Sequence, residues 1–146
     1  MTSPVADLQH LELAEEFYKA FRDLPQNGPS GVPVNWPRYF ALCHAIELAL
    51  KAFLLAHGWS DQQTRDFKFR HNISKLMTEA IALGLNISPT ARSEIDLLSE
   101  AHKKYLPRYP QGGAVFTIEQ FEQPFVELLT AVALAIRGGT RLWVNY

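Results

Sequence analysis

The stretch HAIELALKAFLLAHG, residues 44–58, restricts the possible folds of this chain more than any other feature. Its apolar side chains recur at the three- and four-residue spacings of an α-helix. The apolar face of that helix consists of Leu42, Ile46, Ala49, Leu50 and Phe53. The opposite side carries a narrow polar stripe of His44, Glu47 and Lys51, beside Phe40 and Leu54. The sequence therefore predicts a helix from about residue 36 to Gly58 that packs its apolar face inside the protein.

Four other segments have the same helical period, and local signals mark where each begins or ends. They cover residues 5–24, 71–83, 88–105 and 118–137. Ser88 followed by Pro89 predicts a capped helix start, and Ser60 followed by Gln63 predicts a capping box on a short helical turn. Thr117 with Gln120 suggests a cap for the last segment, in which Pro124 predicts a kink or a new start.

No segment shows the sustained alternation of a β-strand, and two long connectors are rich in proline and glycine. The predicted fold class is therefore all-α: an antiparallel up-and-down bundle of four to five helices with long Pro/Gly-rich connectors. We expect one domain over residues 1–146. Its expected parts are an N-terminal helix (1–24), a connector (25–36), a core bundle (37–137) and an apolar tail (138–146).

Composition excludes several classes of protein. With 14 Lys and Arg against 15 Asp and Glu, the net charge of -1 excludes coating of nucleic acid through bulk charge. The single cysteine, Cys43, excludes an internal disulfide and a multi-cysteine zinc site, and its apolar surroundings predict a core residue. The N-terminus lacks the pattern of a signal peptide, and Glu, Lys or Gly interrupts the longest apolar stretches, which predicts a cytoplasmic protein without a membrane span.

The polar stripe has two interpretations, and the sequence leaves both open. Glu47 and Lys51 are four residues apart with the acid first, the favourable order for an ion pair on a solvated helix face. Alternatively, the stripe is covered by a connector or another chain and helps to form a site. His44 and Glu47 reverse the Glu-x-x-His order of iron sites in helical bundles and occur once, so we expect neither a metal nor a cofactor.

Two groups of basic residues stand out on this neutral chain. The first contains Arg65, Lys68, Arg70, His71 and Lys75, and the second contains His102, Lys103, Lys104, Arg108 and Tyr109. Each group is either a solvated helix end or a surface that donates hydrogen bonds to phosphates. Tyr109 either packs on the bundle or stacks on a base. The predicted ligand- or nucleic-acid-binding residues are Glu47, Lys51, Arg70, His71, Lys104, Arg108 and Tyr109.

Three of these segments together resemble a known family. CHAIELALKAFLLAHG is similar to the second helix of HEPN domains (higher eukaryotes and prokaryotes nucleotide-binding), where an acid and a lysine lie four apart. HNISKL resembles the turn that opens the family's third helix, and LSEAHKKYLPRYP resembles the end of the fourth helix with its Arg-Tyr-Pro connector. The order and spacing agree over residues 37–137.

The resemblance implies an antiparallel bundle that forms a homodimer. It also implies that the protein works beside a small nucleotidyltransferase, as in toxin–antitoxin pairs, or binds a nucleotide or RNA. Glu47, Lys51, His71, Arg108 and Tyr109 are the residues that match the family's functional positions.

The sequence departs from the ribonuclease branch of that family, which carries an arginine and, four to six positions later, a histidine near the last helix. Here no histidine follows His102. The candidate residues for catalysis are therefore scattered: His71, Arg108, Arg38 and His44. The sequence favours a non-catalytic module, and the alternatives are a metal-independent, toxin-like endoribonuclease and a purely structural helical adaptor.

Overall fold

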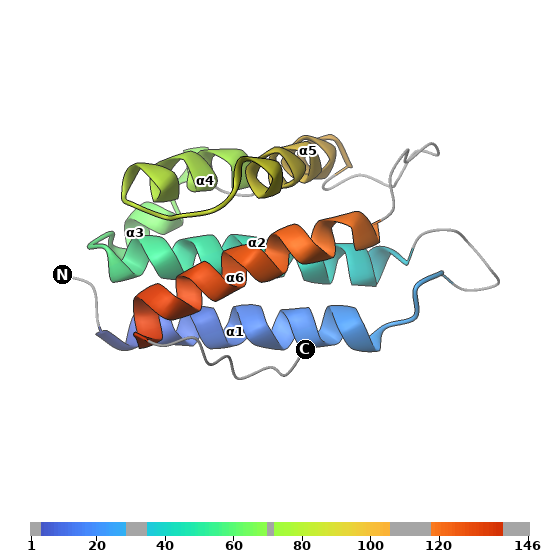
Figure 1. Ribbon diagram of the computed structural model, residues 1–146, viewed down its shortest axis with the longest axis horizontal. Helices are drawn as coiled ribbons and strands as arrows, with labels where there is room; N and C mark the ends of the chain where they lie inside the picture. Colours follow the sequence, from blue (N-terminus) through green and yellow to red (C-terminus); the bar gives the residue numbers. More distant parts are fainter. Residues whose placement is uncertain (1–3, 29–34, 70–71, 106–117, 139–146) are drawn as a thin grey trace.

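A computed structural model describes residues 4–28, 35–69, 72–105 and 118–138, and all regular structure in these ranges is helical (Figure 1). The α-helices are α1 Pro4–Asp23, α2 Trp36–Ala56, α3 Asp61–Thr64, α4 Ile73–Ala82, α5 Pro89–Tyr105 and α6 Glu122–Arg137. Two 3₁₀ turns accompany them, η2 Phe67–Phe69 and η3 Ile118–Phe121. The all-α class predicted from the sequence is confirmed.

Helix α2 is the central element, and it packs against α1, α4 and α6 (Figure 1). It runs antiparallel to α1, because Arg38 near its start contacts Phe21 near the end of α1, whereas His44 contacts Phe17. Fifteen of its 21 residues are buried. The apolar face predicted from the helical wheel is buried, but so is most of the remaining circumference, because neighbouring helices cover α2 on several sides.

Among the described helices, α2 is the one that is long and apolar enough to cross a membrane by length and composition. The sequence predicts that charged residues and glycine interrupt every such stretch. With Glu47 and Lys51 included, α2 still meets both criteria, so that prediction is wrong for this helix. However, 78% of its most apolar window is buried inside the protein. A core helix of a globular protein has these properties too.

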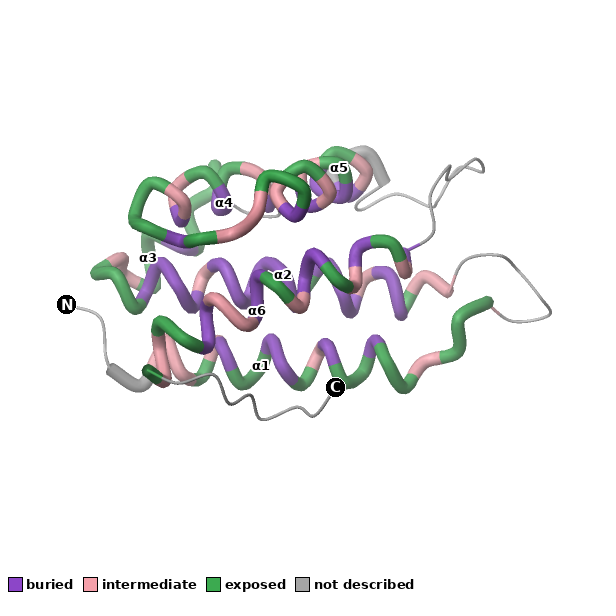
Figure 2. The backbone as a smooth tube through the Cα atoms, in the orientation of Figure 1, coloured by how far each residue is buried: buried purple, intermediate pink, exposed green. Residues whose placement is uncertain are grey.

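The hydrophobic core is one cluster that draws on most of the helices, and Figure 2 shows the buried positions facing the space between them. Its largest fully buried side chains are Tyr18, Phe21, Phe121, Phe125, Leu11, Leu42, Ile46, Leu50, Leu54, Ile73, Leu76 and Met77. Three of these belong to α1. The N-terminal helix is therefore part of the same core as the segment 37–137.

Two of the predicted helix starts have the expected hydrogen bonds. At α3, the hydroxyl oxygen of Ser60 accepts from the Gln63 N–H at 3.0 Å, and the Gln63 side chain accepts from the Ser60 N–H at 2.7 Å. At α5, the hydroxyl oxygen of Ser88 accepts from the Ala91 N–H at 3.1 Å. In addition, the carboxylate of Glu127 on α6 accepts from both the N–H and the hydroxyl of Ser88, at 2.5 and 2.9 Å, and so fastens α6 to the start of α5.

Two starts differ from the sequence prediction. Helix α4 begins at Ile73, where the side chain of Asn72 accepts from the Lys75 N–H at 3.2 Å, rather than at His71. Helix α6 begins at Glu122, after η3, rather than at Ile118. This is the new start that Pro124 predicts, because in the first turn its missing N–H breaks no helical hydrogen bond. The predicted cap Thr117, His71 and residues 139–146 of the apolar tail lie outside the described residues.

Candidate functional site

The acid–base pair on α2 is largely covered by the protein. The Lys51 ammonium donates to the Glu47 carboxylate at 2.9 Å, and the two side chains are 13% and 7% exposed. Water screens a covered pair far less than a surface pair, so the mutual attraction of these charges is stronger than at an ordinary helix surface. The geometry favours the covered interpretation of the stripe over the solvated one.

Aromatic rings of α1, α2 and α5 contact one another along the first half of α2, on the N-terminal side of this pair. His44 is exposed, and the centroid of its ring lies 4.5 Å from that of Phe17 on α1 in an edge-on contact. Half-buried Phe40 and buried Tyr39 lie 6.2 and 6.1 Å from the ring of His102 on α5. Along the stripe, His44 is therefore the exposed member, whereas Glu47 and Lys51 are largely covered.

Cys43 lies in the interior beside this stripe. Burial raises the pKa of its thiol well above the usual range, and the negative charge of Glu47 adds to that increase, while a hydrogen bond with Tyr39 opposes it. The thiol therefore stays neutral at physiological pH. A neutral, buried thiol is a poor nucleophile, so Cys43 acts as a core residue, as the sequence predicts.

Arg38 is buried and committed to structural contacts at the start of α2. Its Nε donates to the Phe21 carbonyl at 3.1 Å, its guanidinium lies 3.9 Å from the centroid of the Phe21 ring, and Nη1 binds the Glu119 carboxylate of η3. His44 is six positions further on, about 120° around the helix, and faces Phe17 instead. Arg38 and His44 therefore face different neighbours, and the structure does not bring them together as a catalytic pair.

Sequence reasoning missed two polar contacts that hold α1 to α6. Arg137 donates to both carboxylate oxygens of Glu15, at 3.0 and 2.5 Å, and the Glu15 side chain is only 2% exposed. The Tyr18 hydroxyl donates to Glu122 at 2.7 Å. The partners are 122 and 104 residues apart, so no local pattern in the sequence signals either contact.

Of the predicted binding residues, the structure places Glu47 and Lys51 together. Arg70, His71, Arg108 and Tyr109 lie outside the described residues, and for Lys104 only its position in α5 is described. Within the described ranges, no three His, Cys, Asp or Glu side chains are grouped so that they could hold a metal ion.

Comparison of this chain with protein-family models, curated proteins and solved structures returned no match.

Proposed function

We propose that this protein is a HEPN-like, non-catalytic helical module that forms a homodimer in the cytoplasm and binds a nucleotide, RNA or a nucleotidyltransferase partner. The observation that carries the proposal is the covered Glu47–Lys51 pair in a central helix rich in alanine and leucine. An acid and a lysine with this spacing, in such a helix, are one of the three motifs on which the resemblance to HEPN domains rests.

The contacts of the candidate catalytic residues favour a binding role over ribonuclease activity. A ribonuclease of this type needs an arginine that can stabilise charge on the reacting phosphate beside a histidine that moves a proton. The guanidinium of Arg38 is instead bound to Glu119 and to the Phe21 carbonyl, away from His44. Moving Arg38 to a substrate would break contacts that join α1, α2 and η3.

The proposed dimer places a second copy over the exposed end of the stripe, at His44. In this arrangement, an antiparallel up-and-down bundle meets its copy along the seam of α1 and α2, where Leu13 is 42% exposed and Phe17 half-buried. Apolar side chains of this kind form the buried centre of homodimer interfaces. The ligand or partner would then meet the two copies of the stripe at one cleft.

Light scattering coupled to size-exclusion chromatography tests the dimer. We expect a mass twice that of the 16.5 kDa chain, and we expect His44→Glu to shift it to the monomer because it introduces a carboxylate next to Glu47. Thr90→Glu is the matched control, since it adds the same charge to an exposed position of α5. A wild-type monomer that retains no nucleotide, RNA or co-expressed nucleotidyltransferase would contradict the proposal.

A further inference from the structure

The five asparagines of this chain differ in the residue that follows them. Asn27 precedes Gly28, whereas the other four precede residues with large side chains: Trp36, Ile73, Ile87 and Tyr146. The backbone nitrogen of the following residue can attack the side-chain amide carbon of an asparagine, and a side chain on that residue crowds the five-membered ring that forms. Glycine has no Cβ and leaves the ring uncrowded, while a β-branched isoleucine crowds it strongly. Asn27 is therefore the asparagine that its own backbone can attack most readily.

Asn27 lies on the surface, in the segment that leads from α1 towards α2 (Figure 1). Helix α1 ends at Asp23, and residues 25–28 belong to no helix. In a helix, the hydrogen-bond ladder fixes the φ and ψ angles and holds a side-chain amide away from the next backbone nitrogen. Residues 25–28 lie outside that ladder, so Asn27 can turn its amide carbon towards the Gly28 nitrogen.

Two of the other asparagines are held by hydrogen bonds at helix starts. The side chains of Asn35 and Asn72 each accept from the backbone N–H three residues further on, at 3.2 Å. These bonds commit both amides to capping α2 and α4. Asn86, by contrast, is exposed and outside the helices, as Asn27 is, but it precedes Ile87. Asn86 is therefore a comparison within the same chain that isolates the effect of the following side chain.

We infer that Asn27 is a site of spontaneous deamidation. The Gly28 nitrogen bonds to the Cγ atom of Asn27, the bond from Cγ to Nδ2 breaks, and ammonia leaves with the proton that the Gly28 nitrogen gives up. Water then opens the resulting succinimide at either carbonyl, which leaves an aspartate or an isoaspartate at position 27. The reaction consumes water and releases ammonia, so it needs neither an enzyme nor an oxidant. The inference does not depend on the proposed function.

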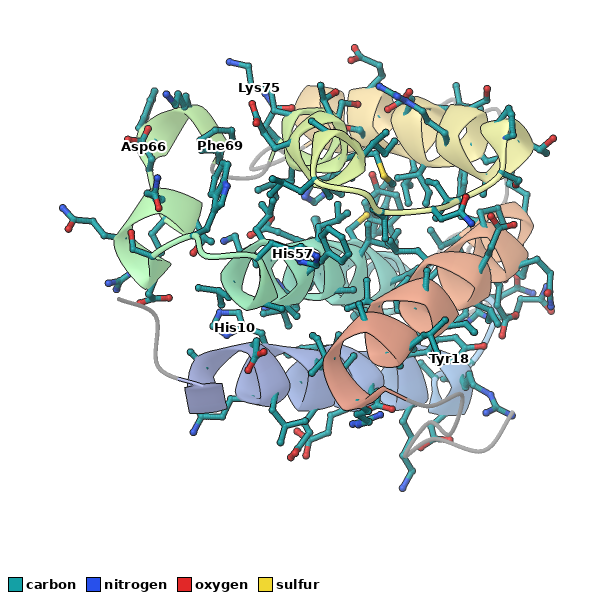
Figure 3. All side chains as sticks on the ribbon, turned by 60° about the vertical axis from the view of Figure 1, so that its left-hand side comes forward. His10, Tyr18, His57, Asp66, Phe69 and Lys75 are labelled. Atoms are coloured by element: carbon teal, nitrogen blue, oxygen red, sulfur yellow. The ribbon has the colours of Figure 1, made fainter. Side chains whose placement is uncertain are left out.

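The modification changes a connector that is closed by a hydrogen bond. The Asn35 side-chain amide donates to the Pro25 carbonyl at 2.8 Å, and residue 27 lies between these two partners in the sequence. The preceding helix is also held, because Tyr18 lies beside α6 (Figure 3) and its hydroxyl donates to Glu122 at 2.7 Å. An isoaspartate routes the backbone through its side chain and so lengthens the connector by one atom. We therefore expect the modification to disturb the hydrogen bond between Asn35 and Pro25.

Peptide mapping by mass spectrometry, after incubation of the purified protein at mildly alkaline pH, tests the inference. We expect the tryptic peptide 23–38 to gain the mass of an acid in place of an amide at position 27. Isoaspartate should be among the products, and an isoaspartyl methyltransferase assay detects it. Asn86 should keep its amide over the same period. The conversion should accelerate as pH rises, because the Gly28 nitrogen must lose its proton to attack.

Two variants separate the attacking residue from the attacked one. Gly28→Ala adds one methyl group and should slow the conversion of Asn27 by about tenfold, which corresponds to about 1.4 kcal/mol in the barrier. Asn27→Gln should keep its amide, because its longer side chain would have to form a six-membered ring. Thermal melting before incubation confirms that both variants are folded. After incubation, the wild-type protein should melt at a lower temperature than Asn27→Gln.

Three outcomes would count against the inference. An amide at position 27 that survives as long as the one at position 86 would reject Asn27 as a preferred site. Equal rates in wild type and Gly28→Ala would reject attack by the Gly28 nitrogen. Equal melting temperatures of incubated wild type and Asn27→Gln would reject the expected effect on the connector. The proposed dimer is decided separately, by light scattering.

Discussion

The seam between α1 and α6 and the polar stripe of α2 both contain a carboxylate that is nearly removed from water. Glu15 and Glu47 have side chains 2% and 7% exposed. Glu15 meets Arg137 through two hydrogen bonds across 122 residues of sequence, whereas Glu47 meets Lys51 one helical turn away. The first pair holds two helices together, whereas the second links positions within one helix. Although the two carboxylates are similarly buried, we therefore expect breaking the two pairs to lower the free energy of unfolding by different amounts.

The largest effect is expected at the seam. Glu15→Ala removes both hydrogen bonds to Arg137 and should lower the free energy of unfolding by about 3 kcal/mol, as for other buried pairs that lose one partner. Urea denaturation measures the change. Glu16→Ala is the matched control, since the neighbouring carboxylate is exposed, and should stay within about 0.5 kcal/mol of wild type. A small effect of Glu15→Ala would mean that α1 and α6 are held by apolar packing alone.

Breaking the pair on α2 should have a smaller effect. Glu47→Ala should cost about 2 kcal/mol, because Lys51 is mostly covered but keeps some access to water. The same denaturation experiment measures it. The double variant Glu47→Ala/Lys51→Met should recover part of the loss, since it removes the remaining charge. A cost below about 0.5 kcal/mol would identify the stripe as solvated and would remove the main support for a covered site.

Cys43, beside that stripe, gives a pH-dependent test of how dry the region is. Its thiol keeps its proton in the folded protein at pH values where the unfolded thiol, with a pKa of about 8.5, has lost it. The unfolded state then binds fewer protons, so the free energy of unfolding falls as pH rises above about 8.5, by up to about 1.4 kcal/mol per pH unit. In Cys43→Ala, the free energy of unfolding measured with urea should fall less steeply as pH rises above about 8.5. If wild type and Cys43→Ala showed the same dependence on pH, water would reach the thiol.

The smallest effect is expected for an exposed pair with the same spacing. Arg65 and Asp61 are four residues apart, like Glu47 and Lys51, but their side chains are 70% and 48% exposed. Arg65→Ala should therefore change stability by less than about 0.5 kcal/mol. If it matched the effect of Glu47→Ala, burial would not be what distinguishes the two pairs.

Local chemistry explains why much of the fold could be predicted. The caps at Ser60 and Ser88 depend on hydrogen bonds within three residues, and both appear as the sequence suggests. The period of apolar residues also identified the five long helices. The start of α6 was placed four residues early because the apolar period continues through η3, whereas Pro124 decides where the α-helix can begin.

The contacts that position the helices relative to one another could not be predicted in this way. Glu15–Arg137, Tyr18–Glu122 and Arg38–Glu119 join residues 81 to 122 positions apart. Arg38 stood out in the sequence only as a candidate for catalysis, and nothing in its own segment identifies Glu119 as its partner. The sequence likewise could not decide whether the stripe on α2 is solvated or covered, because a spacing of four residues is the same in both cases.

The position of Glu47 and Lys51 also bears on the chain while it is being synthesised. Once residues 36–56 have emerged, and before α6 exists to cover them, α2 is a segment of a length and apolarity that membrane-insertion machinery accepts. Glu47 lies next to its midpoint and Lys51 just over one turn further on, and a charged side chain at the centre of such a segment opposes insertion by up to about 3 kcal/mol. In the nascent chain, the pair therefore keeps α2 from entering a membrane until the other helices have been synthesised and pack against it.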